Sequence, residues 1–213
     1  MLDITTQPIT ETSADDVDIS AFEIRDVTVT IEGVTPYSQS SHPGVEKEKS
    51  ETWDAYEARV WKLKAHTNAD GTVYIPGSAF KLCLDEAAVN LNEKIQGRGN
   101  QRWAGVFKMG LAPMSDLNLG VNIADALCEK VYCHANGKRM PGTRVNRLFP
   151  IFHRWGGEVT FRVFNDSITQ EKFEEFFAKA GLLAGVGRGR PSTGCPNGLG
   201  RFRPTKFVWS KVA

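Results

Sequence analysis

The residues best suited to chemistry lie in one glycine- and arginine-rich stretch near the end of the chain. Between Gly185 and Lys206 there are five basic residues and no acidic one. Glycines let the backbone approach phosphate groups, and arginines make bidentate contacts to phosphate oxygens or stack on bases. The candidate nucleic-acid contacts in this stretch are Gly187, Arg188, Arg190, Gly198, Gly200, Arg201 and Arg203. A flexible, solvated loop is the alternative interpretation.

The same stretch does not match the common nucleotide-binding motifs. The run at 185–189 (GVGRG) lacks the spacing of a dinucleotide-binding turn, and it follows a predicted helix where that motif follows a strand. A Gly-Lys-Ser/Thr triplet is absent from the sequence, which excludes a P-loop. We therefore expect no bound cofactor.

A second candidate site is the turn Ile75–Lys81 (IPGSAFK), which opens a predicted helix. With Ser78 as the N-cap, the backbone amides and the hydroxyl at this helix start would form an anion site. Lys81 lies one turn further and is expected to reach the same phosphate. Helix capping alone explains Ser78 equally well.

Further cations and aromatic residues extend the candidate surface. The basic segment 94–102 offers Arg98 and Arg102, and a groove that follows the nucleic-acid backbone is expected from Lys138, Arg139, Arg144 and Arg147. A solvated face explains these charges almost as well. The tryptophans and tyrosine with the potential to stack on bases are Trp53, Tyr56, Trp61 and Trp103, although core packing is the default for Trp61.

Catalysis is not expected. The best candidates for a general base are His42 and then His66, but neither has an obvious partner in the sequence. Cys128, Cys133 and His134 are too widely spaced for a zinc knuckle, and we expect no metal site.

Hydrophobic spacing gives the order of elements that must position these residues. Strands are expected over 21–34, 72–75, 106–109, 130–134 and 201–210, and a hairpin over 144–151 and 158–164 with its turn at Trp155. Helices are expected from Ser78 onward and from the 166–171 cap to Ala180, where Gly181 is the stop. Residues 56–66 suggest a helix followed by a strand. With insertions at about 35–55 and 94–143 removed, the order is βαββαβ, the ferredoxin-like, RRM-like α+β arrangement, whose open sheet face commonly binds single-stranded RNA.

The charge distribution agrees with a polyanion-binding surface. The net charge of +1 divides into −10 for residues 1–93 and +11 for residues 94–213. Mutual attraction between the two halves is the other explanation. We expect residues 1–20 to be an acidic, flexible arm, and 21–213 to be one domain. The absence of a signal peptide, of a long apolar run and of a cysteine framework indicates a cytoplasmic protein without a membrane partner.

The turn at 75–81 and the glycine-rich loop that enters a last strand together resemble the RAMP superfamily. Within it, the chain is similar to the backbone subunits of CRISPR effector complexes and to their bacteriophage-encoded relatives. The resemblance implies an RRM-like palm, a thumb-like inserted hairpin at Thr35–Thr52, and polymerisation along a single strand. It also implies roles for Ser78 and Lys81 at the helix start and for the loop residues named above. The Pro191–Pro196 segment departs from the family pattern.

These observations predict a non-enzymatic protein that coats single-stranded RNA or DNA as a filament and self-associates along the strand. CRISPR-type effector subunits are possible partners implied by the resemblance. Two alternatives remain open: an endoribonuclease of the same superfamily, and a protein-interaction decoy of CRISPR-type filaments. The sequence does not distinguish RNA from DNA, because the contact to the 2′-hydroxyl has no motif.

Overall fold

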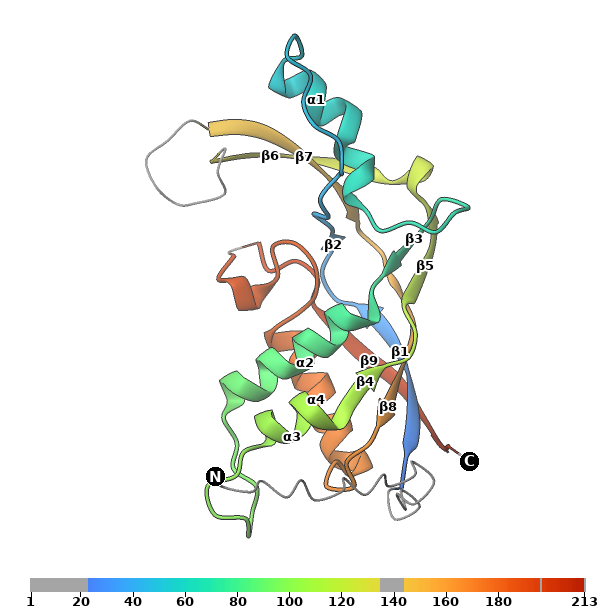
Figure 1. Ribbon diagram of the computed structural model, residues 1–213, viewed down its shortest axis with the longest axis vertical. Coiled ribbons are helices and arrows are strands. Elements are labelled where there is room, and N and C mark those ends of the chain that lie inside the picture. The colour runs from blue at the N-terminus through green and yellow to red at the C-terminus, as the bar shows by residue number, and fades with distance from the viewer. Residues whose placement is uncertain (1–22, 135–143, 196, 213) are drawn as a thin grey trace, which may run out of the picture.

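The computed structural model describes residues 23–134, 144–195 and 197–212. The N-terminal segment 1–20, which was expected to be acidic and flexible, lies outside these residues, as do the candidate contacts Lys138 and Arg139. The described part is a mixed α+β structure with antiparallel sheets (Figure 1). Two parts can be distinguished, which we call the palm and the arm.

The palm is built on a four-stranded sheet in which all neighbouring strands are antiparallel. In spatial order its strands are β4 (Leu111–Pro113), β8 (Gly156–Val163), β1 (Arg25–Gly33) and β9 (Phe202–Lys211). Three helices cover one face of this sheet (Figure 1): α2 (Gly77–Leu91), α3 (Trp103–Gly110) and α4 (Gln170–Leu183).

The hydrophobic core lies between this sheet and the helices. Val27 and Val29 of β1 are 0% exposed, as the predicted alternation requires. Phe173 and Phe177 of α4 pack against Phe161 of β8 with ring centroids 5.8 and 5.6 Å apart. Each buried phenylalanine contributes about 1.5–3 kcal/mol relative to an exposed one, so these rings fix α4 to the sheet.

The open face of the sheet carries hydroxyls and paired charges. Thr28 and Thr160 share a side-chain hydrogen bond of 2.9 Å across β1 and β8. On the same pair of strands Arg162 Nε donates to Asp26 Oδ1 at 2.8 Å, in a bidentate pair. In the four described strands this face presents no exposed aromatic ring. It therefore lacks the stacking platform that an RRM-like sheet commonly offers.

The arm extends from one end of the palm (Figure 1). It consists of α1 (Trp53–Val60), the 3₁₀ turn η2 (Trp61–Lys64) and a ribbon of β6 (Leu127–His134) and β7 (Arg144–Phe152). Two short pairings connect it to the palm: β2 (Tyr37–Ser38) with β7, and β3 (Thr72–Ile75) with β5 (Leu117–Asn122). Two further 3₁₀ turns are η3 (Ile123–Asp125) and η4 (Pro191–Thr193).

A buried ion pair holds α1 and η2 to the ribbon. Lys64 Nζ lies 2.5 Å from Glu57 Oε2, and the two side chains are 5% and 2% exposed. Lys64 also donates to the Leu148 carbonyl at 2.9 Å, while the Leu148 N–H donates to Glu57 at 2.8 Å. Because both charges are hydrogen-bonded to the same backbone residue, their burial is compensated.

The predicted strand at 106–109 is wrong, because these residues belong to helix α3. Trp103, Phe107 and Gly110 are buried at helical spacing on one side of α3. The ring of Phe107 lies 4.8 Å from that of Phe176. Trp103, named above as a base-stacking candidate, is 7% exposed and packs in this core.

The predicted hairpin at 144–151 and 158–164 is also wrong. Both strands exist, but β7 pairs with β2 and β6, whereas β8 pairs with β1 and β4. Buried Trp155 makes the corner between the two sheets, since its carbonyl accepts from the Gly33 N–H and its Nε1 donates to the Thr35 carbonyl, both at 2.8 Å. The strand beside β8 is instead β4, from within the predicted insertion at 94–143.

Three local predictions need smaller corrections. Helix α2 begins at Gly77, so Pro76 and not Ser78 occupies the N-cap. Helix α4 continues past Gly181 to Leu183, because Gly181 packs directly under Phe202 of β9. The helix expected within 56–66 is present as α1, but η2 replaces the strand that was to follow it.

Candidate nucleic-acid interface

The glycine-rich loop that follows α4 is held in place by backbone hydrogen bonds. Within it, Val186 donates to the Gly200 carbonyl at 2.9 Å and Leu199 donates to the Gly189 carbonyl at 3.0 Å. Its end is tied to the segment before β2, because Gly200 N–H donates to the Pro36 carbonyl at 2.8 Å. The loop is therefore a fixed scaffold for its arginines.

Gly187 shows why this loop needs glycine. Its φ is +80°, in the left-handed region that favours glycine. A Cβ there would collide with the Tyr37 ring and the Ser38 carbonyl. The close approach lets the Arg188 N–H donate to the Ser38 carbonyl at 2.8 Å, which sets the direction of the arginine.

A cavity of about 330 Å³ lies where this loop meets the N-terminal part of α2 and the base of the arm. Ser78, Arg188 and Arg190 all contribute to its wall, so the two sequence motifs converge on one site. The remaining lining residues are Tyr37, Gln39, Ser40, Ser41, His66, Pro76, Ala79, Leu82, Cys83, Val186 and Gly187. Among the described residues that line it there is no carboxylate. The charged side chains among these lining residues are therefore Arg188 and Arg190.

Arg188 reaches from the palm to the arm. Its Nε donates to Ser38 Oγ at 3.0 Å, and its Nη2 is ion-paired with Glu129 of β6. Its guanidinium carbon lies 4.2 Å from the ring centroid of Phe149, the residue opposite Glu129 in the ribbon. The side chain is 15% exposed, so Arg188 combines a place in the cavity wall with a structural contact.

Arg190 is held by α2. Its Nη2 lies 3.2 Å from Glu86 Oε1, and its Nε donates to Ser192 Oγ at 3.0 Å. Burial alone would raise the pKa of Glu86, but hydrogen bonds from Arg190 and Ser192 outweigh it, so the pKa lies below its usual range. Glu86 is consequently a carboxylate that neutralises Arg190 at neutral pH.

The start of α2 is only partly available to an anion. The Gly77 N–H donates to Asp116 Oδ1 at 2.8 Å, so a carboxylate already satisfies the first helical amide. Ser78 is exposed and lines a second cavity of about 280 Å³ with Pro113, Met114, Ser115 and Asp116. Ser78 therefore contributes to two cavities, one lined by Arg188 and Arg190 and the other by Asp116.

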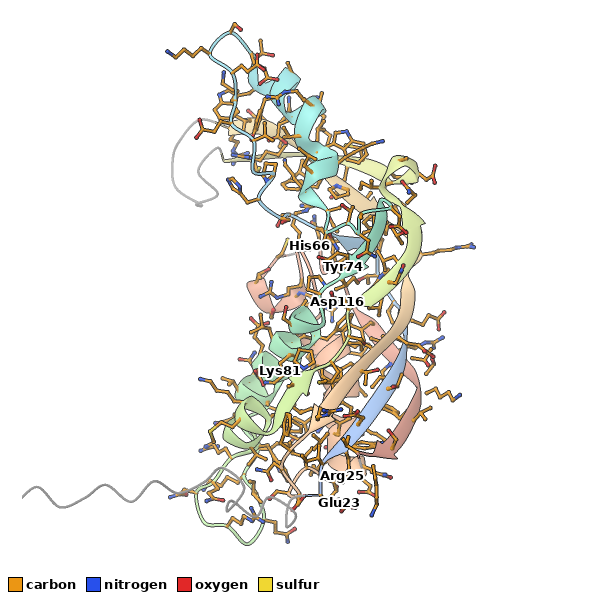
Figure 2. The ribbon with its side chains drawn as sticks, turned by 45° about the vertical axis from the view of Figure 1, so that its right-hand side comes forward. Glu23, Arg25, His66, Tyr74, Lys81 and Asp116 are labelled. Carbon is orange, nitrogen blue, oxygen red and sulfur yellow. The ribbon has the colours of Figure 1, made fainter. Side chains whose placement is uncertain are left out.

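Lys81 lies apart from this convergence. Its Nζ donates to both Asp85 oxygens, at 2.6 and 2.7 Å, and it is absent from the described lining of either cavity. Figure 2 shows His66, Tyr74 and Asp116 near the junction of palm and arm, whereas Lys81 lies on α2, farther from this junction.

The other candidate cations are also placed outside the cavity. Arg98 donates to Ser167 Oγ at 2.9 Å and Arg102 to the Asn92 carbonyl at 2.6 Å, in the α2–α3 connection at the end of the palm away from the arm (Figure 1). In the loop and β9, Arg201 bonds to the Leu182 carbonyl and Arg203 lies 2.7 Å from Glu32. Gly198 and Gly200 shape the loop.

Two candidates lie on the arm. Arg144 lies 5.8 Å from the ring centroid of Tyr132, which is 63% exposed. Arg147 lies 3.4 Å from buried Glu57. The arm also presents Trp53, which is 50% exposed. None of these side chains is among the described residues that line the cavity.

His66 and the residues that position it were only partly foreseen. His66 lines the cavity and packs against Tyr74 in a tilted contact with ring centroids 5.6 Å apart. His42 accepts from the Gly44 N–H and is absent from the described lining. Gln39 fixes this corner by accepting from the His66 N–H at 2.6 Å and donating to the Tyr74 carbonyl at 2.7 Å. A lone glutamine in a polar segment gave no signal of this role.

No family model matches the chain, and no curated protein matches it either. Among solved structures, the chain is similar to one in the cryo-EM structure of Type III-B Cmr-beta bound to cognate target RNA, with a TM-score of 0.50 and 16% identity over 90% of this chain. A similarity at this level of identity shows a shared fold. This shared fold agrees with the fold that the resemblance to the RAMP superfamily implied.

The chain covers 62% of that neighbour, so it spans less than two thirds of the neighbour's length. It is also similar to Cmr6 from Pyrococcus furiosus, with a TM-score of 0.46 and 15% identity over 86% of this chain and 98% of that one.

In the described part of the chain, no helix combines the length and the apolar character that crossing a membrane requires. The same residues contain no cluster of three or more His, Cys, Asp or Glu side chains that could hold a metal ion.

Proposed function

We propose that this RAMP-like protein binds single-stranded nucleic acid, RNA or DNA, across the cavity at the junction of palm and arm. The observation that carries the proposal is the convergence of Ser78, Arg188 and Arg190 on one cavity, with no carboxylate among the described residues that line it. Arginines bind phosphate oxygens in bidentate fashion, and the Ser78 hydroxyl adds a further hydrogen-bonding group. The neighbour bound to cognate target RNA supports the same class of ligand.

Filter binding of labelled single strands over a range of salt concentrations tests this proposal. We expect binding at low salt that weakens linearly on a logarithmic scale, as counterion release requires. The double variant Arg188→Ala with Arg190→Ala should bind all sequences more weakly to a similar extent. A matched control removes the same charge at the other end of the palm, in Arg98→Ala with Arg102→Ala, and should lose less. Absent or salt-independent binding would refute the proposal.

The fold topology is part of the proposal. In chain order β1, α2, β4, β8, α4 and β9 follow the βαββαβ pattern, and the sheet order β4-β8-β1-β9 is the one that two interleaved βαβ units produce. On this assignment the arm is the inserted thumb. The hairpin expected at Thr35–Thr52 is wrong, because the described strand in that segment is β2, which pairs with β7 and not within the segment. The open sheet face, with its paired charges, is not the binding platform.

We further propose that the protein acts without catalysis in the cytoplasm, and that successive copies coat a strand as a filament. Its relatives by fold suggest effector subunits of CRISPR type as partners, and a decoy for such filaments is an alternative role. Negative-stain microscopy with and without a long single strand tests the filament. Particles that keep one size in both conditions would contradict it.

An endoribonuclease is the second candidate function, because His66 lines the same cavity as Arg188. Histidine suits general acid–base chemistry near neutral pH. A denaturing gel of RNA incubated with the wild type and with His66→Ala distinguishes the two functions. Cleavage that disappears in His66→Ala would establish the enzyme, whereas intact RNA at saturating protein favours the coating role.

A further inference from the structure

The two arginines of the cavity wall are neutralised by acids from outside the loop. Glu86 comes from α2 in the palm and pairs with Arg190, and Glu129 comes from β6 in the arm and pairs with Arg188. Neither carboxylate is among the described residues that line the cavity. Each carboxylate therefore contacts its arginine outside the described lining of the cavity.

Both ion pairs are partly shielded from water. The Arg188 and Glu129 side chains are 15% and 29% exposed, and those of Arg190 and Glu86 are 32% and 38% exposed. Screening is weaker there than in open solvent, so each carboxylate both cancels the charge of its arginine and repels an incoming phosphate. The four groups together carry no net charge in the unliganded protein.

We propose that Glu86 and Glu129 determine the specificity of this interface for a continuous strand over a mononucleotide. The inference rests on the proposed function. A ligand must replace or outweigh two carboxylates, which belong to different parts of the molecule. A strand offers consecutive phosphates that compete at both arginines at once. A mononucleotide offers one phosphate group and competes at one arginine only.

The substitution of glutamine for glutamate isolates the charge. Gln retains a side-chain oxygen that accepts from the arginine, so the geometry of the pair is preserved while its repulsion of phosphate is removed. If the carboxylates instead served to position the arginines, the same substitution would weaken binding. The sign of the change therefore distinguishes the two roles.

Fluorescence anisotropy with a labelled single-stranded oligonucleotide, and with AMP as competitor, provides the test. We expect Glu86→Gln and Glu129→Gln each to tighten oligonucleotide binding by about 3–10-fold at low salt, with the gain shrinking at high salt. AMP should compete measurably only with the double variant Glu86→Gln/Glu129→Gln. The gain from Glu86→Gln should vanish in the Arg190→Ala background.

Glu175→Gln is the matched control. It removes the same charge from pairs with Lys172 and Lys179 on α4, outside the described cavity lining, and should leave affinity unchanged. Unchanged or weaker binding by both Gln variants, in a protein that binds strands through Arg190, would overturn this inference and leave the proposed function intact. If no variant binds at all, both are wrong. Binding by the double variant alone would refute the proposed function, because the wild type must bind a strand, and the inference would fall with it.

Discussion

The guanidinium group of Arg188, on a loop of the palm, lies 4.2 Å from the ring centroid of Phe149 in the arm. The same guanidinium is paired with Glu129 on the adjacent strand. One arginine thus joins the glycine-rich loop to the β6–β7 ribbon. The residue expected to bind nucleic acid also connects the two parts of the molecule. A ligand that replaces Glu129 at Arg188 would therefore remove a contact between the palm and the arm.

Removal of Arg188 should loosen the arm more than the palm. Arg188→Ala deletes a partly buried, charge-assisted hydrogen bond and a cation–π contact, and we expect a loss of about 1–3 kcal/mol in stability. Hydrogen–deuterium exchange should rise in β6 and β7 and stay unchanged in α4. Equal acceleration in α4 would show that the contact supports the whole fold and not the arm.

Removal of Arg190 should weaken binding without changing sequence preference. Arg190→Ala is expected to reduce affinity by roughly tenfold at low salt, or about 1.4 kcal/mol. The slope of log affinity against log salt should decrease by about 0.7 because one phosphate contact to a single strand is lost. Titrations with homopolymeric strands of different bases measure both quantities. A loss confined to one base would argue that Arg190 reads bases.

Gly187→Ala should damage the loop through two separate effects. The positive φ costs about 1–2 kcal/mol for an alanine, and the new Cβ meets the Tyr37 ring. The control is Gly194→Ala in the same loop, which has a φ of +67° but nothing within 4 Å of the added Cβ. Urea unfolding should show a clearly larger loss for Gly187→Ala. Equal losses would mean that the contact with Tyr37 relaxes freely.

The Asp26–Arg162 pair should make stability depend on pH in the acidic range. The hydrogen bond from Arg162 lowers the pKa of Asp26 in the folded protein. The carboxylate therefore stabilises the fold above its unfolded-state pKa of about 4, and this contribution is lost as the pH falls through the folded-state pKa. Wild type should exceed Asp26→Asn by about 1 kcal/mol at pH 7, with the gap closing towards pH 3. A gap that is independent of pH would exclude the ion pair as its cause.

The sequence predicted the parts of the fold whose pattern is local. The alternation in β1, the Thr169 cap of α4 and the apolar periodicity of α2 each gave the right element, because periodicity reports burial on one face. It failed at α3, where eight residues are too few to separate helix from strand. The predicted hairpin turn at Trp155 was also wrong. A tryptophan followed by two glycines suits a corner between two sheets as well as it suits a hairpin turn.

The candidate site likewise contains residues that the sequence identified and residues that it did not. The glycine-rich loop and the Ser78 turn were identified because unusual residue types are clustered there. Glu86 and Glu129 were not, since their arginine partners are 104 and 59 residues away along the chain. Ion pairs between distant segments depend on the folded arrangement of the elements, which no spacing in a single sequence reveals.

The hydrogen bonds of Glu57 and Lys64 to the backbone of Leu148 also constrain which insertions and deletions evolution can introduce into β7. In a β-ribbon a shift by one residue turns each side chain and each backbone group to the opposite side. An odd-length insertion in β7 between Leu148 and Ile151, which pairs with Ser38 of β2, would offer the buried charges the wrong edge of the strand and leave them unsatisfied. Homologues should therefore differ in this stretch only by even numbers of residues.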